Sequence, residues 1–591
     1  MSEVSSHQTL IFRIFSFCSA RWRSFLAYCL AFFGSIAGPV WVHRLRPTDL
    51  TYPWRVKDSD LSSVYSLAQA LGQSWTGLVH HSLGAPFNAN LALAFIPDDL
   101  HLEIMRVLVH VTNNPFTAVN LFYVLTYGLC GIAFLYLCDR MRCDRHFGVP
   151  VAIAYSWLPY HFTRMNDGHV FLSAYYMLPI GLLALINLTS WLSGQQETFL
   201  PKSRTKFFIS AIAIVAVGSS GAYYGLFFAL LTLATLCLIP QRGKSFTIWI
   251  NQIFVVGVVS FGFVVAPLLR NIWARTHGLN VQLKRDPTES LQFGGNLARL
   301  FVPWGVWIPN RLQPIVQRQE FEWLAVPMIA VTGIWLLTIG VLRGLARAPG
   351  TGSSSQLQPL YFLFLWALLF FSAGGLSFVF AHGVDSSFRT WNRMSIVIMT
   401  VSLLAVTIHL NSHLRSTLLR RLAPMSLVVL AVTTQLWPIQ NSGISGEPDV
   451  VSVGQFQRLE RIASRIERNI PKDCSILQLP IMAFPEGGIV EGVGNGDHLW
   501  FPLLMDGYRW SYGSPKGSES GDYWLKFQSS QELAVAEAKS RQFCGMLTVR
   551  NPAPDGLISA DDAVIKIEDF WLVLWSRHSL SKSVSNPKIE P

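Results

Sequence analysis

The chain has 591 residues, of which 51% are hydrophobic and 14% are charged, against about 25% charged in a typical soluble domain. The net charge of +11 does not indicate nucleic acid, because the sequence contains no basic run and no basic patch interleaved with aromatic residues. The composition therefore argues against a soluble enzyme and a nucleic-acid-binding protein, and favours a membrane protein with charged loops.

Hydrophobic segments of membrane-spanning length recur through the first three quarters of the chain. A helical span needs about 20 mostly apolar residues, because its backbone N–H and C=O groups must be satisfied inside lipid. The first segment leads into no cleavage site with small residues, so we expect a span and not a removed signal. The strong segments are 25–42, 116–138, 170–192, 246–269, 323–342 and 394–410, and the weaker ones are 147–162, 207–239, 360–371 and 425–439.

The long segment 207–239 decides how often the chain crosses. It could be one long helix, or two short helices broken between Gly218 and Gly221, where glycine weakens a helix. Two passages, or a re-entrant hairpin, would return the chain to the same face. We favour two passages, which gives about eleven spans.

Loop charge then orients the bundle. Loops with several Lys or Arg residues alternate with loops that hold few, and the positive-inside rule places the rich loops in the cytoplasm. Residues 1–24 are then cytoplasmic, and segments 43–115 and 270–322 are long outer loops. Both outer loops are also basic, which indicates an anionic partner, either lipid headgroups or a phosphate-linked substrate. The five basic clusters are Arg140, Arg142 and Arg145; Lys202, Arg204 and Lys206; Arg242 and Lys244; Arg343 and Arg347; and Arg415, Arg420 and Arg421.

The first outer loop contains a helical pattern of apolar residues over 61–78, which predicts a helix lying along the membrane interface. Asp60 immediately precedes this helix, and Asp58 lies two residues earlier. Asp60 could cap the helix, or it could be a carboxylate that takes a proton or binds a cation at the membrane surface. The spacing leaves both interpretations open.

A second amphipathic segment, 100–111, follows in the same loop. Asp98 and Asp99 precede it. They could cap this helix or join the first carboxylates in one acidic pocket, and capping is the more conservative interpretation.

The next outer loop, 159–169, is dense in ionisable residues. It places Arg164 between His161 and His169 at the end of one predicted span and the start of the next. Ionisable groups at membrane level are costly and often functional. Arginine and histidine suit a phosphate, whereas the alternative is that these residues extend to the interface without a ligand. Arg389 and Arg393 lie in a similar way at the outer mouth of the span 394–410.

After residue 439 the composition changes. A helical pattern over 456–470 and short apolar runs at 475–480, 545–549 and 570–575 predict a small α/β domain over 440–577, followed by a disordered tail, 578–591. Cys474 and Cys544 each precede a predicted strand, so parallel neighbours could form a disulfide outside the cytoplasm. The segment 481–517 mixes aromatic and polar residues, which suits carbohydrate binding or packing against the membrane domain.

These features resemble the GT-C superfamily of polytopic glycosyltransferases, which use polyprenyl-phosphate-linked sugars. More narrowly, the chain is similar to a bacterial branch sometimes labelled sugar translocases. The resemblance implies a GT-C-like helical bundle with an extracytoplasmic C-terminal domain, and a catalytic aspartate in the first outer loop that Asp60 matches, with Asp58 as a close competitor. Asp98 or Asp99 matches a second acidic motif only loosely, which leaves a divalent cation, Mg²⁺ or Mn²⁺, open. The resemblance rests on Ser59-Asp60, Leu83 to Phe87, Pro159 to His169, Arg389 to Arg393, Phe484 to Glu486 and Leu504 to Gly517.

The leading hypothesis is a membrane glycosyltransferase that moves a sugar from a polyprenyl-phosphate donor to a glycan, lipid or protein acceptor outside the cytoplasm. A carboxylate would act as general base, and cations would stabilise the leaving phosphate. The alternatives are a transporter or flippase for a lipid-linked glycan, and a non-catalytic assembly factor. Transport is less favoured because the predicted spans are nearly free of charge. The expected substrate-binding residues are His161, Arg164, His169, Arg389, Arg393, Asp98 and Asp99.

Overall fold

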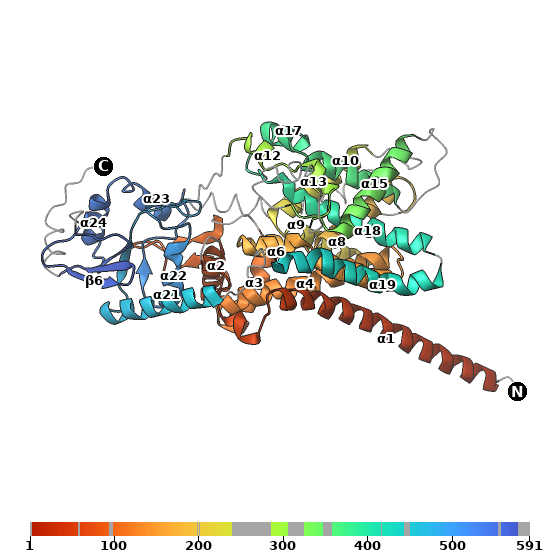
Figure 1. The fold of residues 1–591 in the computed structure, drawn as a ribbon, viewed down its shortest axis with the longest axis horizontal. Coiled ribbons are helices and arrows are strands. Elements are labelled where there is room, and N and C mark those ends of the chain that lie inside the picture. Colours follow the sequence, from red (N-terminus) through yellow and green to blue (C-terminus); the bar gives the residue numbers. More distant parts are fainter. Residues whose placement is uncertain are drawn as a thin grey trace.

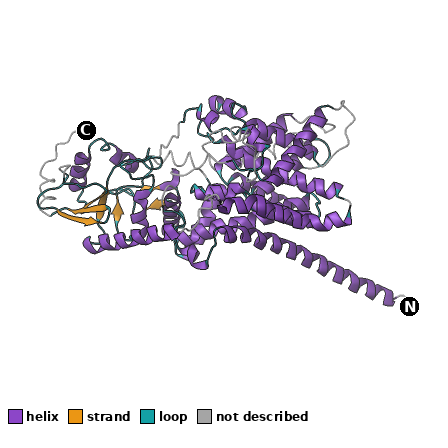
Figure 2. Ribbon diagram, viewed as in Figure 1, coloured by secondary structure: helices purple, strands orange, loops and turns teal. Residues whose placement is uncertain are grey.

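The computed structural model describes residues 3–56, 60–93, 98–197, 199, 201, 203–238, 285–304, 324–346, 357–414, 416–441, 450–553 and 557–576. A helical bundle formed by elements α1 to α20 occupies one side of Figure 1, and a five-stranded sheet with helices α21 to α24 occupies the other. Figure 2 shows the strands gathered away from the bundle. Asp58, the predicted span 246–269 and the predicted tail 578–591 lie outside the described residues.

Five helices are long and apolar enough to cross a membrane. They confirm the predicted spans 25–42, 116–138, 323–342, 394–410 and 425–439, and they make the chain a multi-pass membrane protein. They are Arg21–Val42, which is the inner part of α1 (Glu3–Val42), Pro115–Arg140 (α4), Met328–Leu345 (α15), Trp391–His413 (η3 Trp391–Met394 with α18 Ser395–His413), and Thr417–Asn441 (α19 Thr417–Ala431, η4 Val432–Leu436 and α20 Trp437–Asn441).

The predicted total of about eleven spans is not confirmed. The part of the chain that the structure describes has five such helices, or up to six if the bent pair α9–α10 is one span. Eleven crossings would also need the segment 246–269 and five helices of 12 to 17 residues, which are shorter than the usual span of about 20. These are α5 (Arg145–Ser156), α8 (Leu178–Leu192), α9 (Arg204–Gly218), α10 (Ala222–Leu238) and α16 (Gln358–Phe371).

The predicted break near Gly218 is confirmed. Helices α9 and α10 are bent by 119° at this point. Gly221 has φ of +109°, a conformation that favours glycine. A Cβ on Gly225 would lie 2.6 Å from the Gly218 carbonyl oxygen, so the first turn of α10 packs directly on the end of α9.

Two other predicted spans are also interrupted. The segment 147–162 divides into α5 and the short α6 (Pro159–Asn166), and 170–192 divides into α7 (Val170–Ser173) and α8. Leu158 is extended, with ψ of 135°, because a residue before proline avoids the helical conformation. Pro159 therefore ends one helix and starts the next, which brings residues 159–169 together as a compact unit.

Helix α2 (Leu61–Gln73) confirms the helix predicted in the first outer loop, but its surroundings differ from the expectation. It is covered by protein on its polar side as well, since Ser62, Ser63 and Ser66 are all buried. The second predicted helix is α3 (Asp99–Thr112). The remaining short elements of the bundle side are η1 (Pro47–Thr51), β1 (Val79–His80), β2 (Ala89–Asn90), η2 (Leu91–Leu93), α12 (Glu289–Gln292), α13 (Leu297–Leu300) and α17 (Leu376–Gly383).

The C-terminal sheet has the order β4-β3-β5-β7-β6. Strand β3 pairs in parallel with β4 and β5, whereas β7 pairs in antiparallel with β5 and β6. Its side chains alternate between two apolar layers: Ile476 and Leu547 pack with α21 and α22, whereas Leu477 and Met546 pack with α23 and α24. The elements are β3 (Ser475–Gln478), β4 (Arg509–Trp510), β5 (Gly545–Thr548), β6 (Ala563–Ile567), β7 (Phe570–Leu574), α21 (Val450–Asn469), η5 (Asp497–Leu499), α22 (Trp500–Leu504), α23 (Glu519–Leu525) and α24 (Gln531–Ser540).

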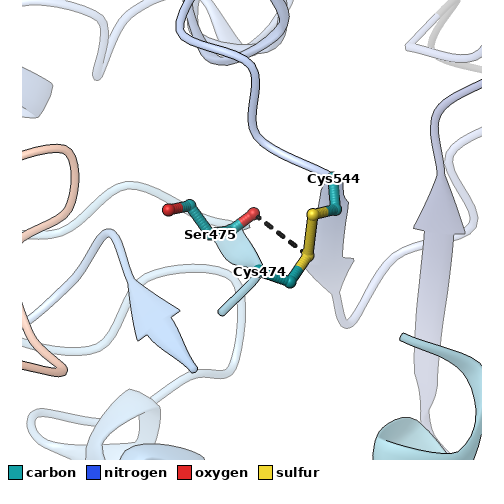
Figure 3. The surroundings of a disulfide bond; sticks show 3 residues. All are labelled: Cys474, Ser475 and Cys544. Atoms are coloured by element: carbon teal, nitrogen blue, oxygen red, sulfur yellow. Dashed lines mark hydrogen bonds between the residues drawn. A yellow bond between two sulfur atoms is a disulfide. The ribbon is translucent and has the colours of Figure 1, made fainter. Parts of the chain in front are cut away.

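Cys474 and Cys544 precede the parallel neighbours β3 and β5, and the structure joins them in a disulfide with 5.8 Å between their Cα atoms (Figure 3). The two parts of the molecule share apolar core. Trp500 and Phe484 from the C-terminal part lie in the same cluster as residues of α2 and α4. The segment between β3 and β4 therefore packs against the first outer loop.

Candidate functional site

Asp60 lies at the start of α2, where a carboxylate commonly caps a helix. Its side chain accepts no capping hydrogen bond, and 51% of its surface is exposed. The carboxylate instead faces two residues that are distant in sequence. His169 Nε2 lies 3.6 Å from Asp60 Oδ2, and Asn495 Nδ2 donates to Asp60 Oδ1 at 3.4 Å. Asp60 is thus the meeting point of three separate segments.

A close backbone contact brings His169 to this position. The Asp60 backbone N–H donates to the Asp167 carbonyl at 3.5 Å. Gly168 has φ of +80°, and a Cβ there would lie 2.6 Å from the Asp60 nitrogen. Only glycine satisfies both conditions, so Gly168 allows the loop to turn and deliver His169 at the start of α7.

The surroundings keep Asp60 ionised. Partial burial alone would raise the pKa of its carboxyl, but the interaction with His169 and the hydrogen bond from Asn495 together hold this pKa below its usual value. An exposed, ionised carboxylate can accept a proton from a hydroxyl group that approaches it, which is the chemistry of a general base.

Arg164 is buried, with 1% of its surface exposed. Its Nη1 atom lies 3.6 Å from Asp167 Oδ2, and its guanidinium lies 4.9 Å from the centre of the Tyr160 ring. The Tyr224 hydroxyl of α10 donates to the Tyr160 hydroxyl at 3.3 Å. Arg164 is therefore joined to Asp60 through Asp167, whose backbone carbonyl contacts Asp60.

Arg393, in η3, lies near the start of α10. Its guanidinium lies over the Tyr223 ring at 4.4 Å, and both Arg393 and Arg164 interact electrostatically with the Tyr224 hydroxyl. Tyr223 and Tyr224 follow the α9–α10 break directly. Arg164 and Arg393 therefore both lie near Tyr224, and Arg164 is linked to Asp60 through Asp167.

Arg389 belongs to a second, more exposed group of charges. It donates to Glu289 Oε2 at 2.9 Å and lies 4.0 Å from Glu486 Oε1. Arg285 and Lys516 donate to Glu486 at 2.6 and 3.3 Å. Burial would raise the pKa of Glu486, but Arg285 and Lys516 hold it below its usual value. The result is three cations and two carboxylates drawn from four segments.

Asp98 and His101 form a separate buried pair. Asp98 caps α3 by accepting from the His101 backbone N–H at 3.4 Å, and it accepts from His101 Nδ1 at 2.8 Å. Burial raises the pKa of Asp98, although His101 opposes this rise. The capping interpretation is therefore the one that the geometry shows. Asp99 is the first residue of α3 and is partly exposed.

His161 lies inside the bundle. It is fully buried, its Nε2 is paired with Thr126 Oγ1 at 2.9 Å, its Nδ1 is paired with the Ser156 carbonyl at 3.2 Å, and its ring stacks on Tyr127 at 3.5 Å. Both ring nitrogens are therefore engaged in packing contacts, and the structure does not bring His161 into the group around Asp60.

Within the described residues, no group of three or more His, Cys, Asp or Glu side chains could hold a metal ion. Asp60 and His169 supply two such groups, and Asp58 is outside the described residues. No chemical step is therefore assigned to a divalent cation.

Several participants were not among the expected site residues. Arg285 lay in a loop noted only as basic, Glu486 and Lys516 lay in the polar and aromatic segment 481–517, and nothing singled out Glu289 or Asn495. A signal existed for Glu486, because it lies in a segment rich in glycine, aromatic and polar residues. Asn495 has no local signal, since its role arises from a contact with a residue 435 positions away.

The comparisons with known proteins find similar proteins among solved structures. A scan against protein-family models and a search of curated proteins find no match. Among solved structures, ArnT from Cupriavidus metallidurans in the apo state aligns with a TM-score of 0.50 and 11% identity over 94% of this chain and 98% of ArnT. ArnT bound to undecaprenyl phosphate aligns with a TM-score of 0.47 and 11% identity, over 93% of this chain and 96% of ArnT.

The arabinofuranosyltransferase AftD from Mycobacteria aligns with a TM-score of 0.46 and 11% identity over 90% of this chain, which spans 37% of the length of AftD. These neighbours are GT-C glycosyltransferases, and none supports the sugar-translocase label. At 11% identity the likeness to apo ArnT concerns the fold. The predicted GT-C-like fold is confirmed, and this chain has it.

Proposed function

We propose that the protein is a membrane glycosyltransferase that moves a sugar from a polyprenyl-phosphate-linked donor to an extracytoplasmic acceptor. The observation that carries this proposal is the state of Asp60, an exposed carboxylate that caps no helix and whose pKa is held low by His169 and Asn495. The GT-C-like fold supports the same reaction class.

In the proposed reaction Asp60 takes the proton from the acceptor hydroxyl while that oxygen attacks the anomeric carbon. The bond from the anomeric carbon to the phosphate oxygen breaks, and the lipid phosphate leaves with the electron pair. A single displacement inverts the anomeric configuration. Asp58 remains the competing base, and His169 orients Asp60 or accepts its proton afterwards.

The leaving phosphate needs positive charge. In this proposal the leaving phosphate is stabilised by Arg389, Arg285 and Lys516, because the side chain of each is partly exposed. Arg164 and Arg393 are buried, so in this proposal they add positive potential near Asp60 and contact the donor only after rearrangement. Asp98, Asp99 and His161 would act through packing.

We also propose the membrane placement. The N-terminus (residues 1–24) lies in the cytoplasm, the bundle over 25–439 crosses the bacterial inner membrane about eleven times, and the C-terminal α/β domain over 440–577 is periplasmic. The basic loops support this orientation, and a disulfide between Cys474 and Cys544 suits an oxidising compartment. The acceptor would be a glycan, lipid or protein.

One observation favours the transporter as a second candidate. The α9–α10 pair is a broken helix, bent by 119°, and broken helices commonly form the substrate sites of transporters. A transporter would keep its activity when Asp60 is neutralised, because transport needs no general base.

The test is a transfer assay with purified full-length protein. We would incubate the protein with a panel of polyprenyl-phosphate sugars, starting with undecaprenyl-phosphate donors, and measure the released lipid phosphate. We expect release with at least one donor and its loss in Asp60→Asn. No release across a broad panel, or equal release by Asp60→Asn, would overturn the proposal. Vesicle translocation that survives Asp60→Asn would favour the transporter.

A further inference from the structure

Asn495 occupies a position that the proposed reaction does not use. Its amide connects two parts of the molecule: Nδ2 donates to Asp60 Oδ1 at 3.4 Å, and Oδ1 accepts from the Gly487 backbone N–H at 3.2 Å. A backbone N–H can only donate, so the contact with Gly487 requires the amide oxygen on that side. The NH₂ group must therefore point toward Asp60.

The segment that carries Asn495, residues 486–497, is held at both ends. Next to Asn495, Gly496 has φ of +84°, and a Cβ there would lie 2.4 Å from Ser62 Oγ. The backbone of the segment therefore contacts the first turn of α2. At the other end, Glu486 accepts hydrogen bonds from Arg285 and Lys516. The docked segment therefore leaves Asn495 little freedom to turn away from Asp60.

Within the part of the chain that the structure describes, few other groups surround Asp60. His169 faces it from the start of α7, and Tyr512, which follows β4, interacts with it electrostatically. Asp167 contributes its backbone carbonyl, while its carboxylate lies beside Arg164. Of these neighbours, Asn495 alone donates to Oδ1 without titrating, so its effect on Asp60 does not change with pH.

We propose that Asn495 is a positioning residue of the transferase site, which keeps Asp60 ionised and in one orientation through the docked segment 486–497. This inference rests on the proposed function. A hydrogen bond to a carboxylate favours its charged form, and a donor on Oδ1 leaves Oδ2, on the His169 side, as the oxygen that meets the acceptor. The site is then complete only when the C-terminal segment rests on α2.

The sharpest variant is Asn495→Asp. A carboxylate oxygen can still accept from Gly487, which preserves the docked segment, but the donor to Asp60 is replaced by a second negative charge. We expect the acid limb of the kcat/KM profile to move to higher pH, and kcat at neutral pH to fall about three- to tenfold, the usual effect of losing one typical hydrogen bond. The donor KM should stay unchanged. Asn495→Ala should move the limb in the same direction by less.

Glu491→Gln is the matched control. Glu491 lies in the same segment, but its side chain pairs with Gln531 and Arg550 and not with Asp60. This variant should keep the wild-type pH profile. The inference would be overturned if the kcat/KM pH profile of Asn495→Asp superimposed on that of the wild type, or if only KM changed while kcat did not.

A second readout does not need turnover. Carbodiimide activates only the protonated carboxyl, so labelling of Asp60 in the full-length protein, followed by peptide mass spectrometry across a pH series, reports its ionisation. We expect half-maximal labelling at higher pH in Asn495→Asp than in wild type or Glu491→Gln. If labelling shifts but no donor is turned over, the contact stands and the proposed function falls. If labelling does not shift, the inference falls regardless of activity.

Discussion

Two aspartates of the first outer loop, Asp60 and Asp98, look equivalent in sequence and differ in the structure. Each immediately precedes a helix, and each contacts a histidine. Asp98 caps its helix and is paired with the local His101 at 2.8 Å, with 7% of its side chain exposed. The Asp60 side chain makes no capping hydrogen bond, lies 3.6 Å from His169 at the start of another helix, and is 51% exposed.

The comparison shows that a carboxylate becomes available for chemistry when its helix does not use it. Both carboxylate oxygens of Asp98 accept hydrogen bonds from His101 in the first turn of α3, and burial raises the pKa of Asp98. Asp60 has partners that come from far away in sequence and hold its pKa low. One position stabilises the fold, and the other presents an ionised group at the surface.

The largest expected effect separates the two residues by activity. Asp60→Asn should lower the transfer rate by about 10²- to 10⁴-fold, the usual contribution of a general base, while Asp98→Asn should leave the rate per folded molecule within about twofold, because an amide oxygen can still accept from His101. The measurement is lipid-phosphate release under saturating donor. Equal losses in both variants would erase the distinction between the two aspartates.

The next effect separates them by stability. Asp98→Ala removes the cap of α3 and leaves the buried His101 Nδ1 without its acceptor, so the free energy of unfolding should fall by about 2–3 kcal/mol. A lower Tm in detergent would report this loss. Asp98→Asn serves as the control and should recover part of it, because an amide offers one acceptor oxygen for the two His101 donors. An unchanged Tm in Asp98→Ala would contradict the structural role.

A feature of this structure can be predicted from the sequence when the residue pattern that encodes it lies within one segment of the chain. Long apolar runs predict the five spanning helices because lipid demands the same pattern everywhere. The strands β3, β5 and β7 and helix α21 were also predicted, since each has its own periodicity. The span predicted over 147–162 failed as a continuous helix because Pro159 breaks it. The burial of the polar side of α2 could not be predicted, because it depends on a segment some four hundred residues later in the chain.

The site divides in the same way. Arg164, His169 and Arg393 could be proposed from the sequence because ionisable residues at the ends of spans are conspicuous, and Asp60 could be proposed because it precedes a predicted helix. Asn495 and Arg285 were missed, because an ordinary polar residue becomes part of a site only through a tertiary contact. His161 drew attention through its neighbours, and its two hydrogen bonds inside the bundle could not be read from spacing.

A smaller effect concerns the histidine beside Asp60. His169→Ala removes an interaction that lowers the Asp60 pKa, so this pKa should rise and the base should become protonated at higher pH. Activity should therefore decline earlier as the pH falls, with a loss on the acid limb of about tenfold per unit of pKa shift and little loss at neutral and alkaline pH. The kcat/KM profile measures this shift. A uniform loss at every pH would indicate a role other than tuning Asp60.

The smallest expected effect tests the other half of the comparison. Asp60→Ala should change the free energy of unfolding by less than about 0.5 kcal/mol, because the side chain is half exposed and makes no capping bond. Since folding lowers the pKa of Asp60, its small stabilising contribution is present at neutral pH and disappears as the pH falls through the folded-state value. Thermal unfolding of the variant and wild type at neutral and acidic pH checks both statements. A Tm loss as large as that of Asp98→Ala would mean that Asp60, like Asp98, serves the fold, and the argument from its availability would fail.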